Sequence, residues 1–147
     1  MDLIKLCLVE SDNTAYIKLM EYVKVKYVQD FGLSLGAKHT LEGNDLFGII
    51  SGYDMLIYWR EIKEFIDNNT KYGSILKEYL LKSKGKLIKN MPNLVDKYGE
   101  FEIAYHDCGY IDSNNLYFII ILTQLNKMDY KEKFINEAAK LIANIND

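Results

Sequence analysis

The chain reads EIAYHDCGYIDSNNLYFIIILTQL from Glu102 to Leu125, and this stretch decides the fold class. Two segments rich in Ile, Tyr, Phe and Val, Glu102 to Ile111 and Leu116 to Leu125, flank the polar run Asp112-Ser113-Asn114-Asn115. β-branched and aromatic residues favour strands, and a short polar run between two strands favours a turn. With the extended segment Leu94 to Tyr98 before it, the stretch predicts an antiparallel three-stranded meander.

Helical periodicity surrounds this meander. Apolar residues at helical spacing predict helices over Asp2 to Glu10, from Ala15 to about Val28, and around Met55 to Ile66 and Ile75 to Leu80. The glycine-rich region Phe31 to Gly52 is interpreted as a long loop. After the strands, a closing helix is predicted with one apolar face that comprises Phe134, Ala138, Leu141, Ile142 and Ile145. Helices, then strands, then a helix predict an α+β fold.

Size and composition fit one domain over residues 1–147, with a helical part over about 1–90 and the strands and closing helix over 91–147. The chain is 49% hydrophobic and 27% charged, which excludes wholesale disorder. A net charge of −3 and a pI near 5.4 argue against nucleic acid as a partner. The longest apolar run, Leu116 to Leu122, has the length of a strand, so no membrane span is expected.

The N-terminal residues are too few and too acidic for a secretory signal, so we expect a soluble chain whose location the sequence leaves open. Cys7 and Cys108 lie far apart and have no ligand-like spacing to a histidine, so neither a metal nor another cofactor is expected. A disulfide between them stays open. His106 and Asp107 are adjacent on a strand and should point to opposite faces, so we treat this pair as incidental.

Two short motifs carry the functional signal. Ser11-Asp12-Asn13 stands between two predicted helices, and Lys97-Tyr98-Gly99 ends a short predicted strand. Their simplest interpretations are an N-cap cluster and a solvated charge at a strand end. In this order and context, however, the motifs resemble the S-D-N and K-T-G signatures of class A β-lactamases and penicillin-binding proteins. The resemblance spans nearly the whole chain and implies the C-terminal part of the β-lactamase/transpeptidase-like fold.

The resemblance also implies a role for each motif residue. That family opens β-lactams or D-Ala-D-Ala peptides through an acyl-serine intermediate. Ser11 would relay a proton to the leaving nitrogen, and Lys97 would attract the substrate carboxylate and favour proton loss from Ser11. The remaining expected contacts come from the Asn13 amide, the Tyr98 position, Gly99, which leaves room for substrate, and the backbone N–H of Glu100 as an oxyanion donor. Asp12 is expected to cap a helix.

The sequence departs from the family pattern at three places. An S-x-x-K motif, which supplies the nucleophile, should precede S-D-N, yet both matches follow it: Ser74 to Lys77 and Ser83 to Lys86, interpreted as exposed helix and loop residues. Tyr98 replaces a small hydroxyl residue, and its ring is expected to crowd the substrate carboxylate. The region Gly36 to Ser51 offers only Glu42-Gly43-Asn44-Asp45-Leu46 in place of the E-x-x-L-N loop of class A enzymes.

We therefore interpret the chain as a fragment of a β-lactamase-like serine hydrolase, inactive alone because the nucleophile segment is missing. The alternative is a non-catalytic module that keeps part of the cleft for binding or assembly. Expected partners are a β-lactam or D-Ala-D-Ala peptide, and either the missing N-terminal segment or a second copy of the chain. The resemblance adds that complete members of the family are usually exported.

Overall fold

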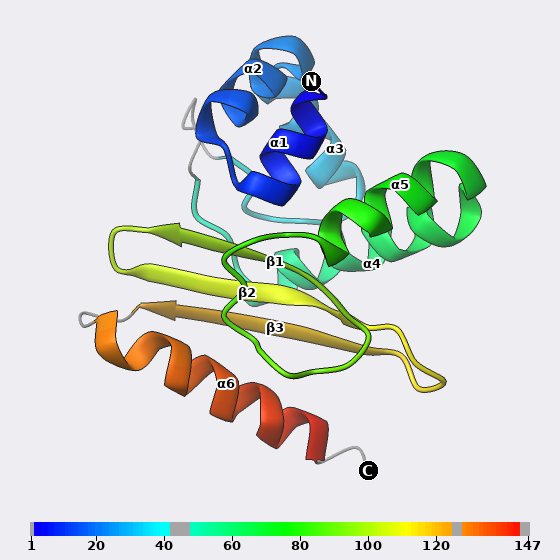
Figure 1. The fold of residues 1–147 in the computed structure, drawn as a ribbon. Helices are drawn as coiled ribbons and strands as arrows, with labels where there is room; N and C mark the ends of the chain where they lie inside the picture. Colours follow the sequence, from blue (N-terminus) through cyan, green and yellow to red (C-terminus); the bar gives the residue numbers. More distant parts are fainter. Residues whose placement is uncertain (1, 42–47, 125–127, 145–147) are drawn as a thin grey trace. The chain divides into compact units, whose positions relative to one another are not determined.

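The computed structural model describes residues 2–41, 48–124 and 128–144. The chain divides into two compact units, Met1–Lys84 and Gly85–Asp147. Helices α1 to α5 belong to the first unit, and strands β1 to β3 with helix α6 belong to the second (Figure 1). Residues 85–90, which the sequence analysis grouped with the helices, therefore cluster with the strands.

The first unit is helical, and its helices begin at polar capping residues. The bounds are α1 Leu3–Glu10, α2 Asn13–Val23, α3 Val25–Ser34, α4 Gly52–Asn68 and α5 Thr70–Leu81. Side-chain oxygens of Asp2, Asp12, Ser51 and Asn69 accept hydrogen bonds from backbone N–H groups in the first turns of α1, α2, α4 and α5. Such caps satisfy backbone donors that have no partner within the helix.

The helix predicted from Ala15 to about Val28 is wrong in one respect, because it is two helices. The break is at Lys24, whose φ is 73° and whose N–H donates to the carbonyl oxygen of Met20 at 2.8 Å. Val23 and Val25 flank the break, and β-branched side chains reduce helix propensity. Helix α3 then continues to Ser34, so the loop predicted from Phe31 begins after the helix ends.

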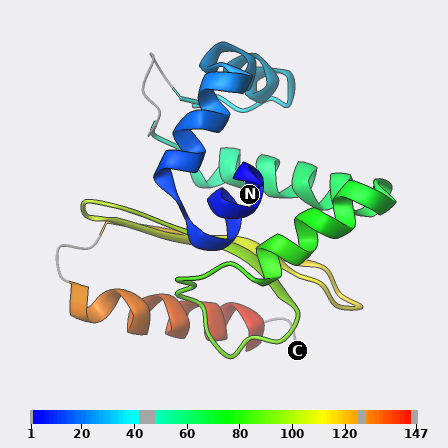
Figure 2. The same ribbon diagram turned by 45° about the horizontal axis from the view of Figure 1, so that its top comes forward.

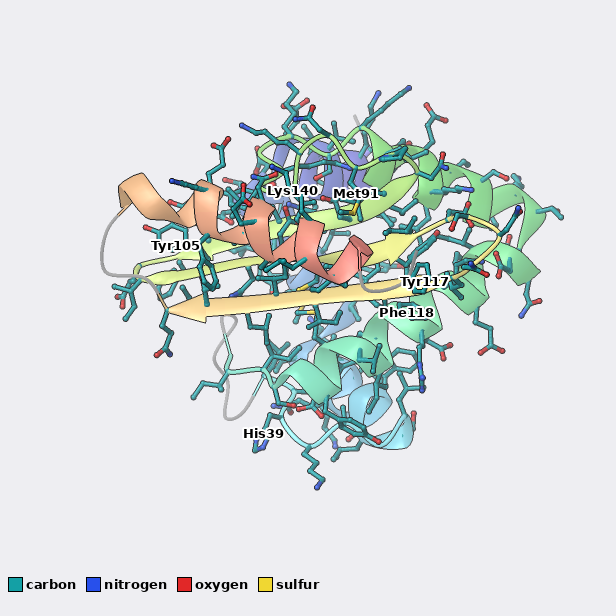
Figure 3. The ribbon with its side chains drawn as sticks, turned by 90° about the horizontal axis from the view of Figure 1, so that it is seen from below. His39, Met91, Tyr105, Tyr117, Phe118 and Lys140 are labelled. Atoms are coloured by element: carbon teal, nitrogen blue, oxygen red, sulfur yellow. The ribbon has the colours of Figure 1, made fainter. Side chains whose placement is uncertain are left out.

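The second unit contains the predicted meander. Strands β1 Leu94–Phe101, β2 Ala104–Ile111 and β3 Tyr117–Gln124 form one antiparallel sheet in the order β1-β2-β3. Helix α6, Met128–Asn144, crosses one face of this sheet, and Met91 and Tyr105 lie on the same face (Figure 3). The α+β order of helices, three antiparallel strands and a terminal helix is confirmed.

The core of the second unit lies between α6 and the sheet. Ile135 and Ala139 of α6 are buried against Ile119 and Ile121 of β3 and Tyr105 of β2. Segment 85–93 lies on the same side of the sheet as α6, where Leu87 and Ile88 join the core (Figure 2). The core is apolar, and its burial drives the association of α6 with the sheet.

The predicted apolar face of α6 is partly wrong. Phe134 and Leu141 are 53% and 64% exposed, whereas Ile135 is fully buried. Ala138 and Ile142 do pack against the core, as expected, and Ile145 lies outside the described residues. The buried face is therefore turned by about one residue, because apolar side chains on both flanks of the helix made the sequence pattern ambiguous.

Candidate functional site

Ser11 occupies the junction between α1 and α2 with an unusual backbone. Its φ and ψ are 55° and 39°, the left-handed helical region. A residue with a Cβ pays about 1–2 kcal/mol to adopt this conformation, so glycine usually takes such a position after a helix. The half-buried Ser11 is therefore held in a strained backbone by its surroundings.

Asp12 and Asn13 complete the junction. The Asp12 carboxylate accepts a hydrogen bond from the N–H of Ala15 at 2.8 Å and caps α2, which confirms its expected structural role. Asn13 is the first residue of α2, and its side chain is exposed. The amide of Asn13 is thus available at the surface of the first unit, beside Ser11.

The junction is anchored to the end of α5. The backbone N–H of Lys84 donates to the carbonyl oxygen of Val9 at 2.9 Å, and the Lys84 ammonium pairs with the Glu10 carboxylate at 2.6 Å. The exposed ion pair contributes little stability, but the buried Val9 and Ala15 side chains fix the two helices on either side of Ser11. Contacts within the first unit therefore position this motif.

Lys97 lies on β1, directly opposite Cys108 of β2. Strand alternation places Lys97 and Gly99 on the face of the sheet opposite to α6. The Lys97 ammonium donates to the carbonyl oxygen of Tyr98 at 2.8 Å and lies 5.4 Å from the centre of the Tyr98 ring. These contacts hold the positive charge against the β1 backbone.

Gly99 and Glu100 continue the same edge of the sheet. A Cβ built at Gly99 would have no atom within 4 Å, so packing within the chain does not require glycine there. The backbone at Gly99 has no positive φ either. Glu100 is exposed, and its carboxylate accepts a hydrogen bond from the Tyr98 hydroxyl at 2.7 Å. The space over Gly99 is therefore open.

The Tyr98 ring packs on the opposite face of β1 from Gly99. It contacts the core beneath α6, and a Cβ at Gly85, whose φ is +78°, would lie 2.7 Å from its Cε1 atom. Burial, and next the hydrogen bond to Glu100, raise the pKa of Tyr98 to about 12. The structure thus directs the ring toward the core, away from the position where it was expected to crowd a substrate.

Comparison with known proteins gives the family. The model of the beta-lactamase enzyme family matches residues 1–145. The chain belongs to this family. The resemblance drawn from Ser11-Asp12-Asn13 and Lys97-Tyr98-Gly99 is therefore confirmed at the level of the family. A search of curated proteins finds no match.

The fold agrees with a solved beta-lactamase. The crystal structure of a beta-lactamase from Sphaerobacter thermophilus superposes with a TM-score of 0.78 at 18% sequence identity. The alignment covers 98% of this chain but only 63% of that one. At this identity the likeness establishes the fold, and this beta-lactamase-family chain spans less than two thirds of the length of that relative.

The two S-x-x-K matches lie in different surroundings. Ser74 is exposed within α5, as expected, and its hydroxyl donates to the carbonyl oxygen of Thr70 at 2.6 Å. The exposed loop position expected for Ser83 is wrong: the residue is 7% exposed, and no described group hydrogen-bonds its hydroxyl. Lys86, its motif partner, forms an ion pair with Asp96.

Asp54, in the first turn of α4, holds Lys38, His39 and Ser51 by hydrogen bonds. The buried Asp54 carboxylate accepts hydrogen bonds from the N–H groups of Lys38 (2.8 Å) and His39 (3.2 Å) and from the Ser51 hydroxyl (2.8 Å). Burial alone would raise the pKa of Asp54, but these hydrogen bonds lower it overall. Glu42-Gly43-Asn44-Asp45-Leu46 lies outside the described residues.

His106 and Asp107 point to opposite faces of β2, as predicted. The Nδ1 atom of His106 accepts a hydrogen bond from the N–H of Thr123 at 3.1 Å, and burial lowers the pKa of His106. Across the described ranges, no group of three or more His, Cys, Asp or Glu side chains could hold a metal ion. Cys7 and Cys108 do not form a disulfide with each other, and no helix in the described part of the chain could cross a membrane.

One set of ionisable residues was not predicted from the sequence. Asp96 and Asp107 are fully buried on the sheet face beneath α6, together with the partly exposed Lys86. The available signal was an acidic residue at an inward position of each of two adjacent strands, but it becomes informative only when the strand register is known. Asp96 precedes Lys97 in the sequence, and both aspartates lie on the other face of the sheet from Lys97.

Proposed function

We propose that this chain supplies the proton-relay and carboxylate-binding half of an acyl-serine hydrolase that acts on β-lactams or D-Ala-D-Ala peptides. Ser11 relays a proton to the leaving nitrogen, and Asn13 holds the acyl-amide carbonyl of the substrate. Lys97 attracts the substrate carboxylate, which lies along Gly99, and the N–H of Glu100 is one oxyanion donor. Tyr98 contributes its backbone carbonyl, which holds the Lys97 ammonium.

The observation that carries the proposal is the left-handed backbone of Ser11 in a chain of the beta-lactamase family. Strained backbone at a non-glycine residue supports a functional hypothesis when the surrounding structure maintains it. Here a serine occupies the position after α1 that glycine would fill at lower cost. A hydroxyl that can both donate and accept a proton gives a reason to keep serine.

The nucleophile of the proposed reaction lies outside this sequence, in a segment that carries S-x-x-K. The exposed Ser74 hydroxyl donates a hydrogen bond within α5, and Lys86 is paired with Asp96, so we assign the nucleophile to neither of the two matches. The chain alone should therefore lack the covalent step. The same reasoning supports the alternative, a non-catalytic binding or assembly module that retains this half of the cleft.

Intact-mass spectrometry after incubation with a labelled penicillin tests the absence of a nucleophile. We expect no covalent adduct and no hydrolysis of a chromogenic cephalosporin above background, because positioning groups alone cannot form the acyl intermediate. A penicillin adduct on Ser11 or Ser74 would show that the nucleophile is within the chain. Reading the DNA upstream of the Met1 codon for an in-frame S-x-x-K separates the hydrolase from the non-catalytic module.

Backbone NMR during titration with benzylpenicillin tests whether the two motifs bind the same ligand. We expect Asn13 amide signals and the signals of residues 97–100 to shift with one common dissociation constant. Lys97→Ala should weaken this binding about tenfold or more, because it removes the partner of the substrate carboxylate. Lys89→Ala, which removes an exposed lysine paired with Glu132, is the matched control and should not change it. Shifts confined to one of the two motifs would contradict a common site.

A further inference from the structure

The two buried carboxyl groups of the sheet lie on one face of neighbouring strands. Asp96 of β1 is opposite Gly109 of β2, and Asp107 of β2 is opposite Tyr98 of β1. This register makes the two aspartates diagonal neighbours on the face beneath α6. A Cβ on Gly109 would lie 2.7 Å and 2.8 Å from Asp96 Cα and Cβ, so glycine is needed for the strands to approach here. Both aspartates are fully buried.

One oxygen of each carboxyl group is occupied by segment 85–93. Asp107 Oδ2 accepts hydrogen bonds from the N–H groups of Leu87 (2.7 Å) and Ile88 (2.8 Å). Asp96 Oδ1 forms an ion pair with the Lys86 ammonium. The two aspartates therefore fasten three consecutive residues of the segment to the sheet.

The second oxygen of each carboxyl group has no such partner in the described part of the chain. Within the described residues, no donor group reaches Asp96 Oδ2 or Asp107 Oδ1. The diagonal register places the two carboxyl groups on the same buried face, and the nearby charge of Asp107 helps to raise the pKa of Asp96. Ionised carboxylates can only accept hydrogen bonds, so a bond between the two requires a proton on one of them.

Counting charges leads to the same requirement. With one proton on the pair, its single negative charge is balanced by Lys86, and the cluster is neutral. Without the proton, the cluster buries one uncompensated negative charge, which a low-dielectric interior strongly disfavours. We propose that Asp96 and Asp107 share one proton in the folded chain, and that loss of this proton at rising pH loosens the attachment of residues 86–88 to the sheet.

The surroundings favour Asp96 as the residue that carries the proton. Burial, and next the charge of Asp107, raise the pKa of Asp96 to about 7, against the opposing effect of Lys86. Burial also raises the pKa of Asp107, but its hydrogen bonds from two backbone N–H groups favour its ionised form. Asp107 is therefore the acceptor and Asp96 the donor in the shared hydrogen bond.

The sign of the pH effect follows from the raised pKa of Asp96. An unfolded aspartate has a pKa of about 3.9, so between about pH 4 and pH 7 the folded chain binds a proton that the unfolded chain has lost. The stability contributed by this proton is fully present below about pH 4 and is lost as pH rises through about 7.

Other ionisable groups near the pair do not produce this effect. On the same face, the pKa of Tyr98 is raised to about 12, first by burial, so its hydroxyl stays neutral in this range. Lys89, in segment 85–93, pairs with the exposed Glu132 of α6. Cys108, on the opposite face, has its pKa raised to about 12, chiefly by burial. His106 on that face has a lowered pKa because of burial, so its protonation destabilises the fold as pH falls, the opposite direction.

Carbon-13 NMR of the aspartate side-chain carboxyls in the full chain tests the shared proton directly. Between pH 4 and pH 9 we expect one aspartate carboxyl signal to titrate with a midpoint near neutral pH. An aspartate with an ordinary pKa of about 3.9 is already fully ionised by about pH 6. Hydrogen exchange of the Leu87 and Ile88 amides, corrected for its intrinsic pH dependence, should accelerate at least severalfold across the same midpoint. If every aspartate carboxyl is ionised by pH 5.5, the proposal is overturned.

Asp96→Asn provides the second test, because its amide can donate to Asp107 and its carbonyl oxygen can accept from Lys86 without a shared proton. We expect this variant to unfold at a higher urea concentration than the unmodified chain at pH 8 and to lose the decline in stability between pH 5 and pH 8. The control, Glu137→Gln, removes an exposed carboxylate of α6 paired with Lys140 and should keep the decline. An identical pH slope in Asp96→Asn and the unmodified chain would contradict the proposal, and the NMR titration decides it if the variant does not fold.

Discussion

The α1–α2 junction and strand β1 hold their motif residues in different ways. At the junction, Ser11 has a left-handed backbone between two helices. On β1, Lys97 and Gly99 are part of a regular antiparallel ladder with β2, and Gly99 has neither strain nor contacts that require glycine. The comparison shows that the junction carries a local energetic cost, whereas β1 obtains its geometry from the register of the sheet.

The two edge strands of the sheet differ in their expected tendency to self-associate, and this is the largest expected effect. β1 carries Lys97 and Glu100, but the run from Tyr117 to Thr123 on β3 has neither charge nor proline, the usual protections of an edge. Among the described residues, β2 is the strand that pairs with β3. We therefore expect self-association through β3, with a dissociation constant of about 1 μM, equivalent to about 8 kcal/mol. Recruitment of the S-x-x-K segment supplied in trans would use the same edge.

Light scattering at micromolar concentration measures this association. Ile120→Lys should shift the chain toward monomer, because a charge on the strand opposes pairing of two identical edges. Ile120→Thr keeps a β-branched side chain without the charge and is the control for loss of apolar surface. A clean, stable monomer of the unmodified chain would contradict the open-edge account and leave β1 as the edge to examine.

Substitution of two glycines on neighbouring strands should give the next largest effect, a change in the free energy of unfolding. Gly109→Ala should destabilise the chain by about 2–4 kcal/mol, because the new Cβ would overlap the Val95 carbonyl oxygen and Asp96. Gly99→Ala should instead change the free energy of unfolding by at most about 0.5 kcal/mol, because the site is open. Urea denaturation measures both changes.

The same pair of variants tests the role of β1. If Gly99 is kept for ligand approach, Gly99→Ala should weaken penicillin binding while the fold stays intact. Equal losses of stability in Gly99→Ala and Gly109→Ala would show that Gly99 is structural, and the contrast between β1 and the junction would no longer hold.

Loss of the cap of α2 should lower the free energy of unfolding by about 1 kcal/mol. Asp12→Ala removes the acceptor for the N–H of Ala15, and loss of such a cap typically costs about 1 kcal/mol. Asp12→Asn keeps an oxygen acceptor at the same place and should retain most of the stability. Thermal unfolding compares the two variants, and an equal loss in both would mean that the charge of Asp12, rather than the cap, stabilises the junction.

Local signals in the sequence predicted most helices and strands. The break between α2 and α3 and the buried face of α6 depend on long-range contacts. The polar caps and apolar spacing located most helices, and β-branched runs located the strands, because these preferences act within a few residues. The break at Lys24 was missed because the apolar spacing continues through it. The buried face of α6 was shifted because Phe134 and Leu141 are apolar but exposed.

In the candidate site, too, some features could be predicted from local sequence and others depend on long-range contacts. Ser11-Asp12-Asn13 and Lys97-Tyr98-Gly99 could be found by their residue types alone. The direction of the Tyr98 ring follows from strand alternation once Lys97 is assigned to one face. The Asp96–Asp107 pair could not be predicted, because it depends on which residues of two strands lie opposite each other. The left-handed backbone of Ser11 likewise depends on how α1 and α2 are held.

The smallest expected change in the free energy of unfolding concerns two residues with strained backbones, of which one is proposed to have a function. Ser11 and Lys24 are both non-glycine residues with positive φ, 55° and 73°, and each lies between two helices of the first unit. Replacing either with glycine removes the conformational cost of the Cβ but increases the entropy of the unfolded chain, so each variant should gain about 0.5 kcal/mol. Urea denaturation of the two variants measures this gain.

Only one of these glycine variants should affect ligand chemistry. Lys24→Gly should bind penicillin as the unmodified chain does. Ser11→Gly keeps the backbone geometry but removes the hydroxyl, so a chain reassembled with an S-x-x-K segment should lose acylation by at least about 100-fold, a typical contribution of one proton-transfer group. Because Ser11→Gly is expected to be at least as stable as the unmodified chain, unfolding cannot explain that loss. Full acylation by Ser11→Gly would show that the strained serine is not the proton relay.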